Sequence, residues 1–288
     1  MKKKWLVFFL LICCWLPAKE NRYFLSICAF FKNEAPFLRE WIEYHKLLGV
    51  DHVYLYNNGS TDGSVKVLQP YIQQQFVTLV HWPDLAPRDE EDPLWLLSTK
   101  MPAYENALKR TALGHTKWLL FLSVDEFLVL PPDHSIRDFL QEFNDFPGLA
   151  LASEFFDASW KGALPQRELV IESTEITKEP EQHPYRGVEK MIVKPDQCSH
   201  FTWPPYRCHF KDKQIAMNVS YAESRVQRYI DRKSFKPIHS VAKVLSFPYK
   251  LPEEEKKAYL KMGFEIEDQE CLVRRFIPPL KQAIHITP

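Results

Sequence analysis

The stretch that decides the fold is KWLLFLSVDEFLVL, residues 117–130. Its first apolar run, residues 118–122, is too short for a buried helix and is typical of a central strand in a covered sheet. Ser123, Asp125 and Glu126 interrupt the apolar run, which then resumes. Carboxylates at the carboxyl end of a buried parallel strand lie where open α/β sheets bind ligands, and burying them without a partner is costly. The stretch therefore predicts a strand that ends at a ligand site.

The composition is that of an ordinary globular protein. The chain has 288 residues, 45% hydrophobic and 26% charged, which is enough to bury a large core. Lys plus Arg and Asp plus Glu both number 37, so no basic field holds nucleic acid, and we predict no nucleic-acid partner. No Gly-rich phosphate loop of either common pattern occurs. Its absence disfavours P-loop, dinucleotide-binding and nucleotidyltransferase enzymes.

Before residue 117 the chain alternates apolar runs with amphipathic ones. The patterns predict strands over 23–31, 50–56 and 76–82, helices over 35–48, 65–71 and 101–113, and then the strand at 118–122. Alternation of this kind predicts an α/β fold with a mostly parallel sheet and right-handed crossovers.

After Pro147 the pattern becomes less regular. A short helix over 135–143 is followed by short strands expected at 149–156, 169–173 and 191–194 between Pro-, His- and Trp-bearing loops. We expect this half to extend the sheet with an irregular acceptor-side part. A charged helix is expected at 253–261, and the tail 274–288 is expected to be weakly ordered.

The first 18 residues have the layout of a secretory signal: three lysines, an apolar run at 5–16, then Pro17 and Ala18. A membrane anchor is the runner-up because the run is short for a bilayer span, and lipid attachment at Cys13 or Cys14 is a third possibility. We therefore expect an exported or membrane-associated protein. The expected division is a signal or anchor at 1–18, one main domain at 22–250, and a C-terminal helix and tail at 251–288.

The cysteines beyond the signal do not have zinc-site spacing. Cys28 lies in an apolar run and is most simply a core residue. Cys198 and Cys208 are ten residues apart in a Pro-rich loop, and an exported chain could bridge them.

Polar groups follow three of the predicted strands. They are Asn33 and Glu34, then Asn57, Asn58, Ser60 and Asp62, then Ser123, Asp125 and Glu126. Taken singly, these groups are explained as turns, helix caps or backbone-satisfied carboxylates. Together they describe a ligand crevice at one edge of the sheet. Their oxygens suit Mg²⁺ or Mn²⁺ bridging phosphates.

Three blocks resemble glycosyltransferase family 92 and the wider group of GT-A nucleotide-sugar transferases. They are FFKNEAPFLREWIEYHKLLGVDHVYLYNNGSTDGS (30–64), AYENALKRTALGHTKWLLFLSVDEFLVL (103–130) and KMIVKP (190–195). The resemblance implies a single-domain, Rossmann-like GT-A fold. It also implies transfer of a sugar, usually galactose, from a nucleotide diphosphate donor such as a UDP-sugar to a glycan acceptor, with a divalent metal, usually Mn²⁺ and alternatively Mg²⁺.

The resemblance also carries over site residues by position. Its donor-binding positions fall on Asn33, Glu34, Asn58, Ser60, Asp62, Ser123 and Lys190, and its W…H…G helix on Trp41, His45 and Gly49. Asp125 matches the metal ligand at the end of the motif, and His200 or His209 matches a later histidine. An inverting transfer also needs a general base. The candidates for the base are Glu126, Glu154 and Asp157.

The chain departs from the family motif at its first Asp, which is Ser123 here, so D-V-D-E-F becomes S-V-D-E-F. A family Asn-His-Tyr segment aligns with residues 227–229, Gln-Arg-Tyr. The alternative hypothesis is therefore a weak or inactive relative that binds a nucleotide or glycan without turnover.

Overall fold

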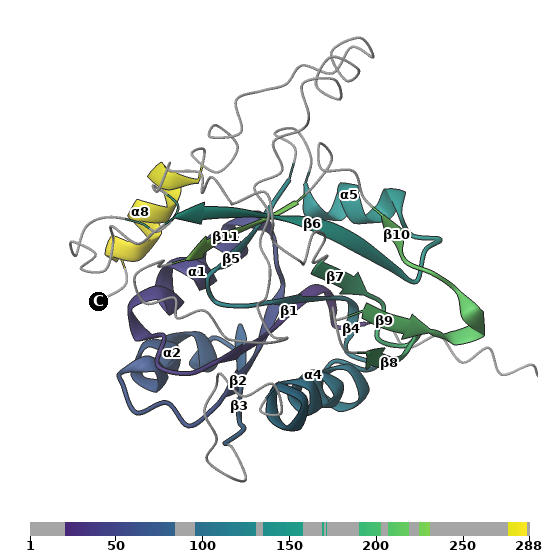
Figure 1. The fold of residues 1–288 in the computed structure, drawn as a ribbon. Coiled ribbons are helices and arrows are strands. Elements are labelled where there is room, and N and C mark those ends of the chain that lie inside the picture. Colours follow the sequence, from purple (N-terminus) through teal and green to yellow (C-terminus); the bar gives the residue numbers. More distant parts are fainter. Residues whose placement is uncertain are drawn as a thin grey trace, which may run out of the picture.

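The computed structural model describes residues 21–83, 96–130, 135–157, 169, 171, 190–202, 207–218, 225–230 and 276–286 (Figure 1). A nine-stranded sheet has the order β3-β2-β1-β4-β7-β6-β11-β5, with β10 paired to β6. A separate hairpin consists of β8 and β9.

The first half of the sheet is parallel and follows the predicted alternation. Its strands are β1 (Tyr23–Phe31), β2 (His52–Asn57), β3 (Val77–His81) and β4 (Thr116–Leu122). Helices α1 (Ala35–Leu48) and α2 (Ser64–Gln73) connect the first three. A helical stretch precedes β4, with α4 (Met101–Asn106) between two π-helical turns, Leu96–Lys100 and Ala107–Thr111.

The second half of the sheet is mixed. It contains β5 (Glu126–Val129), β6 (Gly148–Asp157), β7 (Lys190–Val193), β10 (Met217–Asn218) and β11 (Arg225–Ile230). Strand β7 is antiparallel to both β4 and β6, so β6 runs in the same direction as β4. Strand β11 is parallel to β6 and antiparallel to β5. Helix α5 (Ile136–Glu142) lies between β5 and β6 in the chain.

Alternate residues of the central strands β1, β2 and β4 face two different hydrophobic cores. In β1, Ile27 and Ala29 belong to the core that also contains residues of α1, α2, α5 and β5. Cys28 and Phe30 belong to the core under α4 and the hairpin formed by β8 (Cys198–Thr202) and β9 (Arg207–Phe210). Figure 1 shows α4 beside this hairpin, away from α1 and α2. Because both faces are covered, β1 reads as a continuous apolar run.

Helix α1 begins and ends where its sequence allows. Pro36 occupies the first turn, where a missing N–H costs no hydrogen bond. Gly49 ends the helix with φ of 99°, a left-handed conformation that glycine adopts without strain, and its N–H donates to carbonyls of the last turn.

The structure confirms the predicted α/β fold, a mostly parallel sheet flanked by helices. Strands β5, β8, β9, β10 and β11 were not predicted. At Leu169 and Ile171, the described residues of the predicted 169–173 strand, there is no strand. The predicted segments 1–18 and 253–261 lie outside the described residues. Among the helices that are described, none is long and apolar enough to cross a membrane.

The expectation of a weakly ordered tail was wrong for residues 277–286. They form α8 (Ile277–Ile286), which packs beside α1 in Figure 1. Leu280 is fully buried in the α1-side core, and the Arg39 guanidinium donates to the Ile284 carbonyl over 3.3 Å. The two prolines of this segment lie in the first turn, where a helix tolerates them.

Candidate functional site

Three loops meet at the carboxyl-terminal edge of the parallel half-sheet. Phe31 at the end of β1 is in register with Asn57 of β2, and Ala29 of β1 is in register with Leu122 of β4. The loops that follow β1, β2 and β4 therefore begin side by side. The Asn58 amide donates to the Phe31 carbonyl over 2.9 Å, which joins the first two loops at their base.

The first two loops are fastened by their own polar side chains. The Asn33 amide N–H donates to Ser60 Oγ over 2.9 Å, and Asn33 Oδ1 accepts from the Thr61 amide over 2.8 Å. Asn33 adopts a φ of 56°, a conformation that asparagine tolerates better than most residues. Asn57, one of the polar residues at the end of β2, accepts from the Ser60 amide through Oδ1 over 2.8 Å. These atoms of Asn33 and Ser60, both predicted to bind the donor, hold the loops together.

Asp62 links the starts of two helices. Its Oδ2 accepts from the Ala35 amide over 3.0 Å and its Oδ1 from the Ser64 amide over 2.9 Å, at the first residues of α1 and α2. Burial raises the pKa of Asp62, but the hydrogen bonds from Ser64 and Ala35 outweigh it, and the net pKa lies below the ordinary value. Its carboxylate is thus an anchor for helix ends, where a negative charge is favoured.

The turn after β4 is closed by two hydrogen bonds. The Glu126 amide donates to the Ser123 carbonyl over 3.1 Å, and the Ser123 amide donates to the Glu126 carboxylate Oε2 over 2.7 Å. Val124 is buried in the α1-side core, so the turn is also fixed by packing. Asp125 occupies the third position of this turn and is half-buried. The predicted metal ligand is therefore carried by a rigid turn at the expected edge.

Glu126 and Lys190 form a buried ion pair. Lys190 Nζ lies 2.7 Å from Glu126 Oε1, and the two side chains are 9% and 1% exposed. A general base must reach the hydroxyl of a substrate, and a donor-site cation must reach a phosphate. Both side chains are instead buried and paired with each other. This placement disfavours the predicted roles of Glu126 as base and of Lys190 as diphosphate ligand, and both roles stay predictions.

Helix α1 holds the strand that carries Glu126. Trp41 Nε1 donates to the Glu126 carbonyl over 2.7 Å and the Tyr44 hydroxyl donates to the Leu128 carbonyl over 2.7 Å. The Leu128 amide donates to His45 Nε2 over 3.4 Å, and His45 Nδ1 lies 2.8 Å from the Trp41 carbonyl. Strand β5 pairs with β11 on its other side and is the last strand of the sheet as described, so these side chains satisfy backbone groups at its outer edge.

His45 is neutral in this arrangement. Burial lowers the pKa of His45 from 6.5 to about 3. Nδ1 then carries the proton that it donates to the Trp41 carbonyl, and Nε2 is left as the acceptor for the Leu128 amide. Trp41 and His45 therefore affect the site by holding β5, the strand that follows the Asp125 turn.

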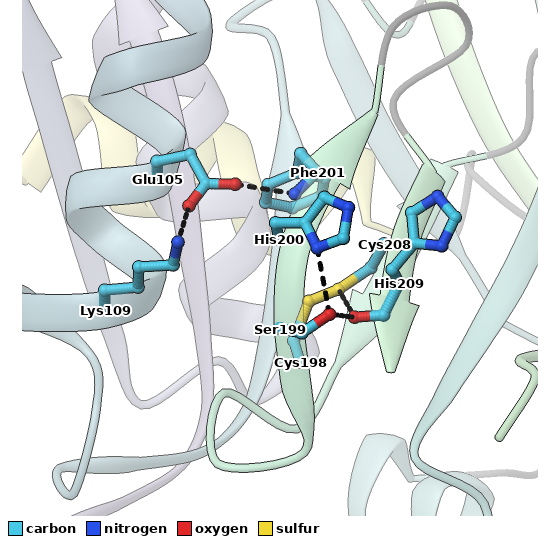
Figure 2. A network of polar contacts seen from close by, with 8 residues as sticks. All are labelled: Glu105, Lys109, Cys198, Ser199, His200, Phe201, Cys208 and His209. Atoms are coloured by element: carbon cyan, nitrogen blue, oxygen red, sulfur yellow. Dashed lines mark hydrogen bonds and ion pairs between the residues drawn. A yellow bond between two sulfur atoms is a disulfide. The ribbon is translucent and has the colours of Figure 1, made fainter. Parts of the chain in front are cut away.

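The β8–β9 hairpin carries the two predicted histidine ligands (Figure 2). A disulfide joins Cys198 to Cys208 on its buried side, as the sequence suggested for an exported chain. His200 and His209 lie opposite each other on the exposed side, with parallel rings whose centroids are 4.6 Å apart. The in-plane lone pairs of two parallel rings do not converge on one point, so this pair as placed does not chelate an ion.

No three His, Cys, Asp or Glu side chains within the described ranges gather closely enough to hold a metal ion. Asp125, His200 and His209 are therefore not brought into one ligand set. Asp125 stays the predicted metal ligand at this edge. Mg²⁺ in nucleotide sites is commonly held by one or two carboxylates, with substrate phosphates and water as the other ligands.

Residues 22–262 match the sequence profile of glycosyltransferase family 92. The chain belongs to this family. A family 92 protein of Oryza sativa subsp. japonica is 29% identical over 216 residues, covering 73% of this chain and 34% of that protein. The Caenorhabditis elegans protein named beta-1,4-galactosyltransferase galt-1 is 34% identical over 116 residues, covering 38% of this chain and 26% of that protein.

Among solved structures, that of Staphylococcus aureus TarS residues 1–349 in complex with UDP is similar to this chain. The two are 12% identical with a TM-score of 0.39, and the match covers 72% of this chain and 60% of that chain. This family 92 chain spans about a third of the length of the curated relatives that it matches.

Two further base candidates of this family 92 protein lie on β6. Glu154 is in register with Gln227 of β11, and Asp157 with Ile230. Leu151 of β6 pairs with Lys190, so both acids lie on the part of β6 that continues beyond Lys190, toward the edge where β4 ends. Their side chains are outside the described set. Both remain predictions.

Glu34 and Asn58 complete the predicted donor site. Asn58 is 3% exposed and Glu34 is half-buried at the N-terminus of α1. Sequence analysis missed Tyr44 as part of the site, because its partner, the Leu128 carbonyl, is set by a tertiary contact. The spacing of Trp41, Tyr44 and His45 on one helix face was the available signal.

Proposed function

We propose that this family 92 protein transfers a sugar from a nucleotide diphosphate donor to a glycan acceptor. Galactose is the proposed sugar and UDP the proposed nucleotide. Family membership over residues 22–262 supports the reaction class, and the partial likeness to the protein named a beta-1,4-galactosyltransferase supports the sugar. The observation that carries the proposal is that the loops after β1, β2 and β4 begin together at one edge, with Asp125 in a rigid turn there.

Each part of this edge has a proposed task. Asp125 is the carboxylate that would hold Mn²⁺, or alternatively Mg²⁺, against the donor diphosphate. A bound divalent ion supplies positive charge to a leaving diphosphate. Glu154 or Asp157 would take the proton from the acceptor hydroxyl. The buried Asn58 and the neighbouring Glu34 are proposed to face the nucleoside.

We also propose that the protein is exported or membrane-associated. Residues 1–18 have the layout of a signal or anchor. The Cys198–Cys208 disulfide supports an oxidising compartment, since such bonds are rare in the cytosol. The mass of the mature amino terminus tests this proposal and separates cleavage from anchoring.

The second candidate is a family member that binds a nucleotide or glycan without turnover. Ser123 favours it, because a hydroxyl replaces the first carboxylate of the family motif. Ser123→Asp separates the two candidates. A large gain in turnover would mark the natural protein as a weakened enzyme, whereas an unchanged or lower rate in an already active protein would mark Ser123 as an adaptation.

The test is release of UDP and transfer of sugar by the full chain, incubated with Mn²⁺, a panel of UDP-sugars and simple glycan acceptors. Asp125→Asn should lower the rate by about a hundredfold, because it removes the charge and keeps the shape of the side chain. Asp212→Asn is the matched control. Asp212 is exposed with a φ of 54°, which asparagine also accepts. No release from any donor would reject the transferase proposal, and equal loss in both variants would reject the role of Asp125.

A further inference from the structure

The strongest unexplained feature is a fully buried carboxylate next to the proposed metal ligand. Glu126 is 0% exposed, yet its carboxylate accepts from the Ser123 amide over 2.7 Å through one oxygen and meets Lys190 Nζ at 2.7 Å through the other. Burying two charges costs several kcal/mol of desolvation that their attraction only partly offsets. A pair of hydrophobic residues would fill the same space at lower cost. The pair therefore needs a reason other than stability.

We infer that Glu126 is a positioning residue for the Asp125 turn, and that Lys190 keeps its carboxylate in the orientation that accepts from Ser123. This inference rests on the proposed function for its catalytic consequence, but its structural part stands on the turn itself. The carboxylate oxygen and the Glu126 amide close the turn from opposite sides. Asp125 lies between two buried residues, Val124 and Glu126, and has little freedom to move.

Helix α1 also supports the Asp125 turn, through hydrogen bonds to β5. Trp41 fixes the Glu126 carbonyl, and Tyr44 and His45 fix the carbonyl and amide of Leu128. Three hydrogen bonds from one helix therefore determine where β5 starts. The Glu126 carboxylate, at the start of β5, accepts from the Ser123 amide and so connects β5 to the turn. The chain of contacts runs from α1 through β5 to the turn that carries Asp125.

Lys190 ties the same turn to the sheet. It lies at the start of β7, paired with Leu151 of β6, and β7 is itself paired with β4. Its ammonium thus reaches Glu126 from a strand adjacent to β4. Two blocks of sequence that are 64 residues apart, the S-V-D-E-F motif and the K-M-I-V-K-P strand, meet in this ion pair. Their joint function is to hold the Asp125 turn.

Double variants separate positioning from a simple role in the core. Single substitution of Glu126 or Lys190 leaves a buried charge unpaired and is expected to impair folding. The Gln/Met variant, Glu126→Gln with Lys190→Met, removes both charges but keeps an acceptor for the Ser123 amide. The Leu/Met variant, Glu126→Leu with Lys190→Met, removes both charges and the acceptor and keeps a similar side-chain volume. Thermal unfolding of both double variants verifies that they fold.

The first readout is amide hydrogen exchange at Ser123, which requires no activity. We expect the wild type and the Gln/Met variant to protect this amide, and the Leu/Met variant to lose about tenfold in protection, as for loss of one buried hydrogen bond. Equal protection in all three proteins would overturn the inference. This result would be the same whether or not the protein is a transferase.

The second readout is kinetic. A positioning role predicts that the Leu/Met variant raises KM for the nucleotide-sugar by about tenfold. The Gln/Met variant should retain most of its kcat and an unchanged pH profile. If both double variants instead lose kcat alike and lose the acid limb of the pH profile, Glu126 is the base and the inference is wrong. If the wild type itself releases no UDP while the exchange result holds, the proposed function fails and the positioning of the turn stands.

Discussion

On the α1 side of the sheet, β5 is held by three buried side chains of one helix, whereas on the α4 side the β8–β9 hairpin is held by a disulfide and a carboxylate. The α1 contacts come from Trp41, Tyr44 and His45. On the other side, Glu105 of α4 accepts from the Phe201 amide over 2.6 Å and pairs with Lys109 at 2.7 Å, as Figure 2 shows.

The difference lies in what each attachment depends on. Burial and hydrogen bonds on the α1 side are present in any compartment. The hairpin depends on an oxidised Cys198–Cys208 pair and on a carboxylate that also meets an exposed lysine. The side that fixes the Asp125 turn is therefore the one that does not depend on redox conditions. We expect substitutions on the α1 side to affect the site and substitutions on the α4 side to affect chiefly the hairpin.

The largest effect is expected from Trp41→Ala. Trp41 is fully buried and donates to the Glu126 carbonyl, so its loss creates a cavity and releases the start of β5. The expected cost is about 3–5 kcal/mol of unfolding free energy. Trp82→Ala is the matched control on the α4 side, where Trp82 is only partly buried and donates to the Thr99 carbonyl over 3.1 Å. Urea unfolding measures both, and a similar loss in the two variants would contradict the comparison.

Breaking the disulfide comes next. Closing a loop of about ten residues restricts the unfolded chain by roughly 3 kcal/mol. We expect dithiothreitol to lower the unfolding midpoint of the wild type and to have no effect on a variant with Cys198→Ala and Cys208→Ala. Nucleotide binding at the Asp125 edge should be retained while the reduced protein stays folded. Loss of binding by the reduced, folded protein would show that the hairpin belongs to the site.

A smaller effect is expected from Tyr44→Phe. The Tyr44 hydroxyl donates to the Leu128 carbonyl over 2.7 Å in the core, so its removal leaves that carbonyl without this donor. The expected cost is about 1–3 kcal/mol. Tyr104→Phe on the α4 side is the control, because its hydroxyl lies 3.5 Å from the Leu122 carbonyl, a weaker geometry. Chemical unfolding compares them, and an equal cost would mean that the distance does not reflect the strength of the two bonds.

The first half of the fold could be predicted from the sequence because its information is local. Apolar runs at strands and a helical stripe over 35–48 identify β1, α1, β2 and β4 within a few residues. Parallel connection of neighbouring strands then brings their carboxyl ends together. That is why the edge carrying Asn33, Asn58 and Asp125 was placed correctly.

The roles of individual side chains were not predictable in the same way. Whether Glu126 faces substrate or core depends on Lys190 and Trp41, which are 64 and 85 residues away in the sequence. Likewise, residues 274–288 were expected to be weakly ordered, but residues 277–286 form a helix with its two prolines in the first turn, and Leu280 is buried. In each case a distant partner determines the role of the residue. No local pattern contains that information.

The smallest effect is a dependence of stability on pH that should separate the two sides. Burial lowers the pKa of His45 to about 3, so the folded protein keeps this ring neutral while the unfolded chain protonates it below about 6.5. Stability is therefore fully present above pH 6.5 and is lost as the pH falls from 6.5 toward 3, by about 1.4 kcal/mol per pH unit once well below 6.5. His52, whose pKa burial lowers to about 4, adds to this dependence in the same direction.

Urea unfolding between pH 6.5 and 5 isolates the histidines, because Asp62, whose pKa lies below 3.8, acts at lower pH. His45→Gln should reduce the slope of unfolding free energy against pH by about 1.4 kcal/mol per pH unit, the value for one proton. The control is the same substitution at an exposed histidine, His81→Gln, which should leave the slope unchanged. The His45 share of the acid sensitivity would then come from the α1 side, since His45 must stay neutral to accept from the Leu128 amide. If His45→Gln keeps the wild-type slope, the His45 ring is not the neutral acceptor that holds β5, and the Asp125 turn must be fixed by Trp41, Tyr44 and the Glu126–Lys190 pair alone.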